Sequence, residues 1–296
     1  MSRALEQAKD VRPRSPSPAS RVAEALAPGH GRLGFARVDG ATALVRSEAA
    51  TPLQILAPRP RGPSACAFLV SHGGGLVAGD DVAIDVDVGP GAAALLTTQA
   101  ETKVYRTDQG EGAAQRLRAR VAEGGVLVLL PEPVCPFAGA RYEQRQRFHL
   151  APGASLLAVD AVVAGRIARG ERWAFDRHES SNELFVDGRL VLGDALVLEP
   201  RPAGGALASR LADFDAFAVA FAVGPAFAAG ARGLLEMLAR APVERGASVL
   251  AAASPVADGA LLRCAATSAE ALARWLREAL AFAAAPLGED PFARRW

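Results

Sequence analysis

Apolar and polar residues alternate along two segments in the first two thirds of the chain. Residues 81–88 (DVAIDVDV) place an apolar side chain at every second position, and residues 141–150 (RYEQRQRFHL) follow the same period. Successive side chains of a strand point to opposite faces, so this period predicts strands with one buried and one solvated face. An Asp-Gly pair at 187–188, flanked by apolar residues, predicts a hairpin turn.

A short unit recurs three times between these segments. VGPGAAALL, VAEGGVLVL and LAPGASLLA each join a strand, a tight glycine turn and an apolar strand, with Gly91, Gly124 and Gly153 spaced by 33 and 29 residues. A unit of this length cannot bury its own apolar face, so the repeat favours stacked β layers or a solenoid-like coil. Glycine turns are also common between unrelated strands, which leaves a simpler explanation open.

The last third of the chain changes character. Residues 217–223 read as an apolar strand and residues 231–241 as a helix. Thr267 to Glu270 has the form of a capping box, and a second helix should follow it and stop before Pro286. The apolar stripe of that helix is formed by Leu272, Trp275, Leu276, Ala279, Leu280 and Ala283.

These patterns predict a mainly β fold, a stacked, helix-like coil of β-strands with a small C-terminal helical layer. We expect one domain over 21–296, with β layers over about 28–225 and helices over about 226–296. Residues 1–20 are rich in Arg, Ser and Pro, which predicts a disordered tail. The apolar stretch around Phe214, Phe217, Phe221 and Phe227 either fills a core or marks an interface, and we expect mostly core.

Composition narrows the function classes. Half of the residues are apolar and 22% are charged, so the chain is not wholly disordered, and a net charge of +1 gives no indication of nucleic-acid binding. Three widely spaced cysteines exclude a disulfide framework and a zinc site of paired cysteines. No secretory signal or membrane-length apolar run is evident, so we expect a cytoplasmic protein that does not bind membranes.

The densest motif is SHGGGLVAGD at residues 71–80. Its His-Gly-Gly-Gly resembles the oxyanion loop of esterases, but the G-x-S-x-G nucleophile elbow that an esterase requires is missing. The glycines also match neither a dinucleotide fingerprint nor a P-loop. We therefore expect no hydrolysis of esters or nucleoside triphosphates, and no enzymatic activity.

A second motif, TTQAETKVYR, covers residues 97–106. The paired hydroxyls of Thr97 and Thr98 can bond to backbone or substrate, although ordinary strand propensity explains them equally well. Lys103 is the one lysine outside the predicted tail, and a solvated strand face is its simpler explanation. The four histidines show no metal-ligand spacing, so we expect no tight metal site.

Together these segments resemble the family of urease accessory proteins called UreD or UreH. The resemblance covers about 28–296 and rests on GGGLVAGD (73–80), GPGAAALLTTQAETKVYR (89–106), residues 129–157 and GRIARGERWAFD (165–176). The matching motif residues are Gly73, Gly74, Gly75, Gly79, Asp80, Thr97, Thr98, Gln99, Thr102, Lys103, Tyr105, Arg106, Gly139 and Arg141.

The resemblance implies a mainly β coil with C-terminal helices, which agrees with the layered prediction. It also implies a maturation scaffold that binds urease apoprotein and, with UreF and the GTPase UreG, helps to incorporate the nickel metallocentre. UreE would then be the nickel donor, and no cofactor would be tightly bound.

Nickel accepts imidazole, thiolate and carboxylate ligands, and a protein that passes nickel onward should hold it weakly. Weak donors of this kind are His72, Asp80, Glu132, Asp160 and Asp176. Asp80, directly after the glycine run, fits two roles: it can cap a tight turn or line a nickel passage. The rival hypothesis for the whole chain is a structural adaptor that touches no metal.

Overall fold

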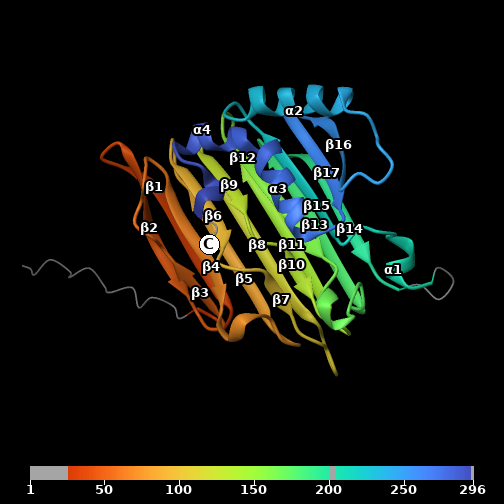
Figure 1. The fold of residues 1–296 in the computed structure, drawn as a ribbon. Coiled ribbons are helices and arrows are strands. Elements are labelled where there is room, and N and C mark those ends of the chain that lie inside the picture. The colour runs from red at the N-terminus through yellow and green to blue at the C-terminus, as the bar shows by residue number, and fades with distance from the viewer. Residues whose placement is uncertain (1–25, 201–204, 295–296) are drawn as a thin grey trace, which may run out of the picture.

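The computed structural model describes residues 26–200 and 205–294, which form two stacked β-sheets with helices over one of them (Figure 1). The predicted tail at 1–20 lies outside the described residues. The first sheet has seven strands in the order β14-β13-β11-β8-β5-β1-β2. Their bounds are β1 His30–Val38, β2 Ala41–Ala49, β5 Asp81–Val88, β8 Ala113–Val121, β11 Arg141–Leu150, β13 Arg177–Val186 and β14 Arg189–Leu198.

The second sheet follows the order β16-β17-β15-β12-β9-β6-β4-β3, with short strands β7 and β10 attached beside β12. Its strands are β3 Leu53–Leu56, β4 Ala65–Ser71, β6 Ala93–Thr98, β7 Thr102–Val104, β9 Val126–Leu130, β10 Val134–Pro136, β12 Ser155–Val163, β15 Ala216–Val223, β16 Val249–Val256 and β17 Gly259–Ala266. The helices are α1 Leu207–Arg210, α2 Ala228–Arg240, α3 Ala269–Ala279 and α4 Ala284–Leu287, with 3₁₀ turns η1 His72–Gly74, η2 Ile167–Arg169, η3 Ala281–Ala283 and η4 Pro291–Arg294.

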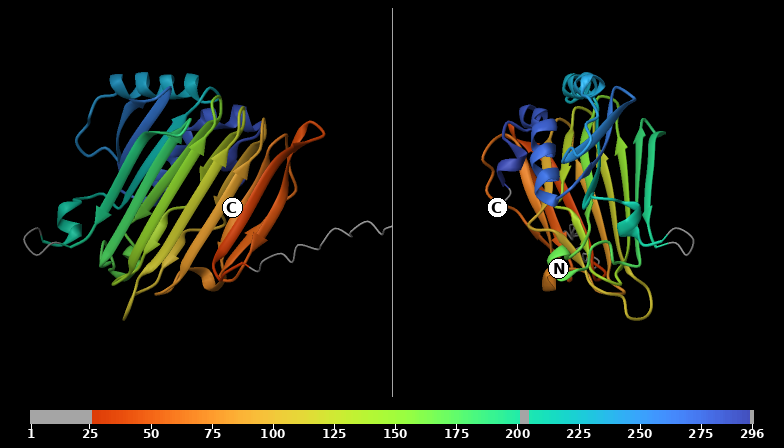
Figure 2. Two further views of the ribbon diagram at one scale, coloured as in Figure 1. Left: turned by 180° about the vertical axis from the view of Figure 1, so that it is seen from behind. Right: turned by 45° about the vertical axis from the view of Figure 1, so that its right-hand side comes forward.

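The middle of the molecule is a coil of parallel strands. From β4 to β13 the chain passes back and forth between the sheets, so β5, β8, β11 and β13 are parallel neighbours in one sheet and β4, β6, β9 and β12 in the other. The side view in Figure 2 shows the two layers. The predicted solenoid-like stacking is confirmed.

The three repeated glycines lie where the coil turns from the first sheet to the second. Gly91, Gly124 and Gly153 all have positive φ, at 61°, 65° and 75°, which glycine adopts without a Cβ clash. Successive turns are stacked, because the Gly91 amide donates to the Glu123 carbonyl of the next turn at 3.1 Å.

Antiparallel strands close the coil at both ends. At one end β2 pairs with β1 and β3 with β4; at the other β14 pairs with β13, while β15, β17 and β16 extend the second sheet beyond β12. Strands β16 and β17 lie inside the segment predicted to be helical. Their alanine-rich sequence, VLAAASPV in β16, lacks the polar alternation by which a strand can be recognised.

Two apolar cores follow from this layering. One lies between the sheets and includes Phe35, Phe148 and Phe221; the other lies between the second sheet and the helices and includes Phe227 and Phe292. Phe221 and Phe227 therefore have the predicted core role. No helix in the described ranges is long and apolar enough to span a lipid bilayer.

The C-terminal helices differ from prediction in two details. The N-cap of α3 is Ser268, whose hydroxyl accepts the Ala271 amide at 3.1 Å, so the cap is one residue later than the predicted Thr267. Helix α3 ends at Ala279, before Pro286 as predicted, but the predicted stripe continues to Ala283 in η3, and Pro286 lies within α4, a separate four-residue turn. An amide in a first turn has no acceptor inside its helix, so proline is tolerated there.

Candidate functional site

The glycine-rich loop is fixed against strand β7. Leu76 donates to the Lys103 carbonyl and accepts from the Tyr105 amide, both at 2.8 Å, as a single parallel bridge. A Cβ on the buried Gly75 would lie 2.7 Å from the Lys103 carbonyl oxygen. Gly73, Gly74 and Gly79 have positive φ. The first two predicted motifs therefore form one unit, and its glycines serve close backbone approach and turn geometry.

Asp80 caps the end of this loop. One of its carboxylate oxygens accepts the Val77 amide at 2.8 Å, and the Asp80 amide donates to the Val77 carbonyl at 3.1 Å. The Asp80 carbonyl then accepts from Ala114 at the start of β8. Asp80 therefore makes the turn-capping contact, which is one of the two roles that its position in the sequence fits.

The two threonine hydroxyls at the end of β6 hold the neighbouring coil. Thr97 Oγ1 donates to the Leu130 carbonyl at 2.6 Å, and Thr98 Oγ1 accepts the Glu132 amide at 2.8 Å. The adjacent Gln99 is exposed. Thr102 lies in β7 opposite Val134, and its amide donates to the Pro133 carbonyl at 3.1 Å. These threonines therefore anchor the strand ends around residues 130–134.

The remaining motif residues line the outer surface at the same end of the coil. Lys103 is exposed, and Arg106 pairs with Asp108 at 2.8 Å. Tyr105 packs edge-on against Phe137, with ring centroids 5.2 Å apart. Gly139 has positive φ, and a Cβ there would lie 3.1 Å from the Arg106 side chain. The last motif residue, Arg141, is exposed, and its amide donates to Thr107 Oγ1 at 3.3 Å.

Polar side chains meet between the two sheets, where an apolar core would be expected. Asp160 of β12 accepts hydrogen bonds from Gln144 at 2.9 Å, from Asn182 at 3.0 Å and from the Ser180 hydroxyl. Tyr142 donates to Gln144 Oε1 at 3.0 Å. We call Tyr142, Gln144, Asp160, Ser180 and Asn182 the polar seam. It joins β11 and β13 of the first sheet to β12 of the second.

Burial controls the charge of the seam. Burial raises the pKa of Asp160 above its ordinary value, and the donors Ser180, Asn182 and Gln144 oppose the shift. Burial also raises the pKa of Tyr142. The carboxylate of Asp160 is thus costly to ionise but is surrounded by donors that favour the ionised form.

A narrow cavity lies beside the seam. It has a volume of about 20 Å³, enough for about one water molecule. Both sheets contribute to its walls, and the polar lining residues are Thr97, Thr98, Thr102, Gln115, Glu132, Gln144, Gln146 and Asp160. The second motif thus reaches the interior through its threonines.

Of the five predicted weak nickel donors, Glu132 and Asp160 line this one cavity. Asp80 lies in its turn, while His72 and Asp176 are exposed elsewhere. In the described part of the chain, no three His, Cys, Asp or Glu side chains gather closely enough to hold a metal ion. The predicted donors are therefore divided among separate places in the fold.

His178 extends the polar interior beyond the seam, although it belongs to none of the sequence motifs. Its ring is fully buried and stacks on Tyr142, with centroids 5.7 Å apart. Neither ring nitrogen has a hydrogen-bond partner among the described residues. Burial lowers the pKa of His178 to about 4, so the ring is neutral at physiological pH.

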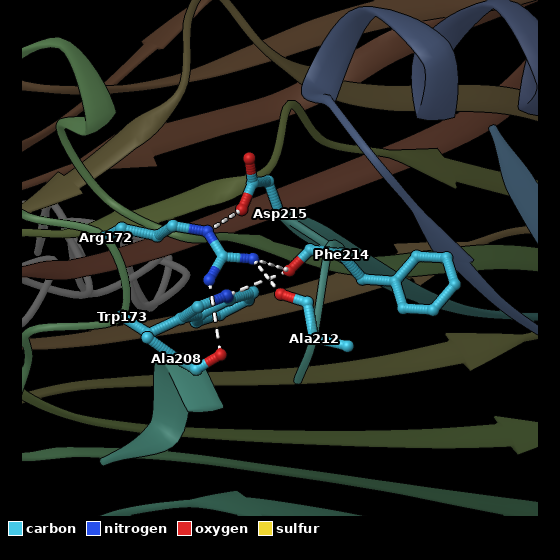
Figure 3. A network of polar contacts seen from close by, with 6 residues as sticks. All are labelled: Arg172, Trp173, Ala208, Ala212, Phe214 and Asp215. Carbon is cyan, nitrogen blue, oxygen red and sulfur yellow. Dashed lines mark hydrogen bonds and ion pairs between the residues drawn. The ribbon is translucent and has the colours of Figure 1, made fainter. Parts of the chain in front are cut away.

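Two residues of the motif at 165–176 hold the segment between α1 and β15 in place (Figure 3). The Arg172 guanidinium contacts the Asp215 carboxylate and donates to the carbonyls of Ala208, Ala212 and Phe214. Trp173 Nε1 donates to the same Phe214 carbonyl at 2.9 Å. Arg172 and Trp173 thereby fix the segment that leads from α1 into β15.

Known proteins with similar sequences give one consistent family. The family model described as "UreD urease accessory protein" matches residues 27–296. A "Urease accessory protein UreD" from Anaeromyxobacter sp. (strain Fw109-5) is 57% identical over 269 residues, covering 91% of this chain and 90% of the relative.

More distant relatives have corresponding names. One from Sorangium cellulosum (strain So ce56), "Urease accessory protein UreD", is 51% identical and covers 90% of this chain and 84% of its own length. "Urease accessory protein D" of Oryza sativa subsp. indica is 35% identical, and the match covers 68% of this chain and 67% of the relative. The layered coil, its motif residues and these matches agree, and the chain belongs to the UreD family of urease accessory proteins.

Proposed function

We propose that this chain is a urease maturation chaperone that acts in the cytoplasm. It binds urease apoprotein together with UreF and, through that complex, the GTPase UreG, and it has no catalytic activity of its own. The names of the matching family and relatives support the urease accessory role. The partners are those that the sequence resemblance implies.

We further propose that nickel, supplied by UreE, passes transiently through the interior of the chain. The observation that carries this proposal is the narrow cavity lined by Asp160 and Glu132 beside the polar seam. A fully buried carboxylate is expensive to maintain, and a purely structural core would favour apolar residues there. Two carboxylates without a closed ligand set give the weak oxygen contacts that transfer requires.

The test measures nickel per urease active site after co-expression with all the urease genes. Asp160→Asn keeps the size of the side chain and removes its charge, and we expect urease with several-fold less nickel. The matched control is Asp39→Asn, which changes an exposed aspartate that does not line the cavity and was not among the predicted donors, and it should leave nickel loading unchanged.

Pull-downs of the same variants separate passage from assembly. Asp160→Asn should still co-purify with UreF and urease apoprotein. Full nickel loading with Asp160→Asn and also with Glu132→Gln would refute passage and leave the structural adaptor as the function. Absence of both partners from wild-type pull-downs at low salt would count against the chaperone role itself.

A further inference from the structure

Strand β16 forms the outer edge of the second sheet, and it pairs with β17 on one side. Natural sheets protect their edges with charged side chains or very short strands. The edge strand β2 carries Arg46 and Glu48, β14 carries Arg189 and Asp194, and β3 has four residues. Among these edges of the described chain, β16 is an eight-residue strand without a charged residue.

A large apolar groove runs along this edge, with a volume of about 780 Å³. Helix α2 crosses the end of β16 and β17 (Figure 1), and its residues Leu235 and Leu238 form one wall together with Val243. The opposite wall is formed by Leu196 of β14 and Phe217 of β15. Both faces of a strand added beside β16 would therefore meet apolar side chains.

Large apolar side chains are also exposed around the groove. Val243 is 87% exposed and Leu250 is 36% exposed, and both line it. Nearby Val197 and Met237 are 41% and 47% exposed. Apolar side chains gathered at a groove indicate a surface that is covered in an assembly.

The charges of the groove restrict what covers it. Arg263 and Asp194, which line it, form an ion pair with each other at 2.5 Å and leave no net charge. Glu244 also lines the groove, and no ion pair to it is present within residues 26–200 and 205–294. The complementary occupant is therefore apolar along most of its length and carries one basic residue, which faces Glu244.

We infer that β16 binds an extended, apolar segment of a partner protein as an additional strand of the second sheet. Main-chain hydrogen bonds to the free edge would supply affinity, and alternate side chains would enter the two sides of the groove. Pro255 has no amide hydrogen, so the added strand covers about four or five residues of β16 before it. This inference rests on the proposed function, which supplies the partner assembly.

Amide hydrogen exchange in the assembled complex tests the inference. The complex with UreF and urease apoprotein, purified after co-expression, is compared with the chain alone. We expect alternate amides within 249–254 to exchange at least about tenfold more slowly in the complex, because the edge amides become hydrogen-bonded. A complex that forms with unchanged exchange in this strand overturns the inference and leaves the proposed function intact.

Two variants provide an independent measurement. Leu250→Lys places a charge in the groove and should reduce co-purification of one partner at least about tenfold, because burying an ammonium group is costly. Val45→Lys is the matched control, since Val45 is 59% exposed on edge strand β2 of the other sheet, and it should bind normally. Equal binding by both variants contradicts the inference.

A second copy of the chain is the alternative occupant. Sedimentation of the chain alone would then show a species of twice the monomer mass that Leu250→Lys disperses, and this outcome also overturns the inference. If wild-type chain binds neither partner, the proposed function has failed as well, so the two failures are distinguishable.

Discussion

At the scale of single residues, His178 couples the stability of the fold to pH. The folded protein holds the ring neutral, with a pKa of about 4, whereas an unfolded histidine has a pKa of 6.5. Below pH 6.5 the unfolded chain takes up a proton that the folded chain does not bind. This contribution to folding stability is complete above pH 6.5 and falls as the pH decreases toward 4.

His178→Phe should remove this pH dependence. Phe keeps the ring stacked on Tyr142 and introduces no unpaired nitrogen. When the pH is lowered from 7.5 to 5, the unfolding free energy of wild type should fall by about 2 kcal/mol more than that of the variant. Urea unfolding at both pH values measures this difference. His72→Gln, at an exposed position, is the control, and parallel pH profiles for wild type and His178→Phe would contradict the prediction.

Gly75 is required because of close approach, since its φ of 167° is ordinary extended backbone. Gly75→Ala would place a Cβ 2.7 Å from the Lys103 carbonyl oxygen and should cost roughly 2 kcal/mol through displacement of the loop from β7. Thermal unfolding measures this cost. Gly193→Ala, at a strand position with open space, should stay within about 0.5 kcal/mol of wild type. Similar losses for both variants would argue against a steric role.

The polar seam shows where residue-level prediction failed. Asp160 was selected as a weak donor, but Gln144, Ser180 and Asn182 were not. A signal was present, because Gln144 occupies an inward position of the alternating segment 141–150. Polar residues on the face that should be apolar indicate a buried network. The partner residues on another coil could be identified only after the register of β11 against β13 was known.

At the scale of elements, helix α3 depends on its N-cap. Ser268→Ala should cost about 1 kcal/mol, because the Ala271 amide loses its acceptor. Thr267→Ala tests the alternative cap that the sequence indicated. The Thr267 hydroxyl donates to an exposed carbonyl at 3.4 Å, and its loss should cost less than about 0.5 kcal/mol. Chemical denaturation of both variants decides between the positions, and a larger loss for Thr267→Ala would reverse the assignment.

The segment before β15 depends on Arg172. Lysine at this position can reach one acceptor, whereas the guanidinium contacts Asp215 and three carbonyls, including that of Phe214. Arg172→Lys should make chymotryptic cleavage near Leu211 and Phe214 roughly five to ten times faster. Limited proteolysis measures this rate. Arg169→Lys, at an exposed position of the same motif, should be cleaved like wild type.

Strands and turns were predicted correctly where the alternation of apolar and polar residues and the residues of the turns indicated the same structure. Residues 81–88 and 141–150 are strands, and the Asp187-Gly188 turn joins β13 to β14 with positive φ at both residues. Prediction failed for β16 and β17, whose alanines fit helix and strand alike. Pairing of β17 with β15, and of β16 with β17, decides their conformation, and the alanine-rich strands themselves do not show it.

At the scale of the whole molecule, the repeat of glycine turns was sufficient to predict the stacked coil. Of the antiparallel strands that close its ends, the Asp187-Gly188 turn indicated the β13–β14 pair and residues 217–223 indicated β15. The pairing of β2 with β1 and of β15 with β12 was not predictable, because these pairs break the repeat. Nor was the cavity between the sheets, which depends on side chains from several coils. The family resemblance supplied the accessory role that no motif carried alone.

The amino-terminal tail should be dispensable. Residues 1–20 are poor in apolar residues and rich in Arg, Ser and Pro. A chain that begins at Arg21 should activate co-expressed urease as well as the full-length chain does. Urease activity per unit of soluble accessory protein measures this. Lower activity from a soluble, truncated chain would show that the tail binds a partner.

The stacked glycine turns have a consequence for the length of the molecule. One coil corresponds to the 33 residues from Gly91 to Gly124 and contributes one long strand to each sheet. Neighbouring strands are about 4.8 Å apart, so gain or loss of a coil changes the separation between the two ends of the molecule by that step. The length of the molecule therefore changes only in whole coils. Duplication of residues 91–123 would move the β16 groove farther from β2 and β3 by one strand spacing, about 4.8 Å.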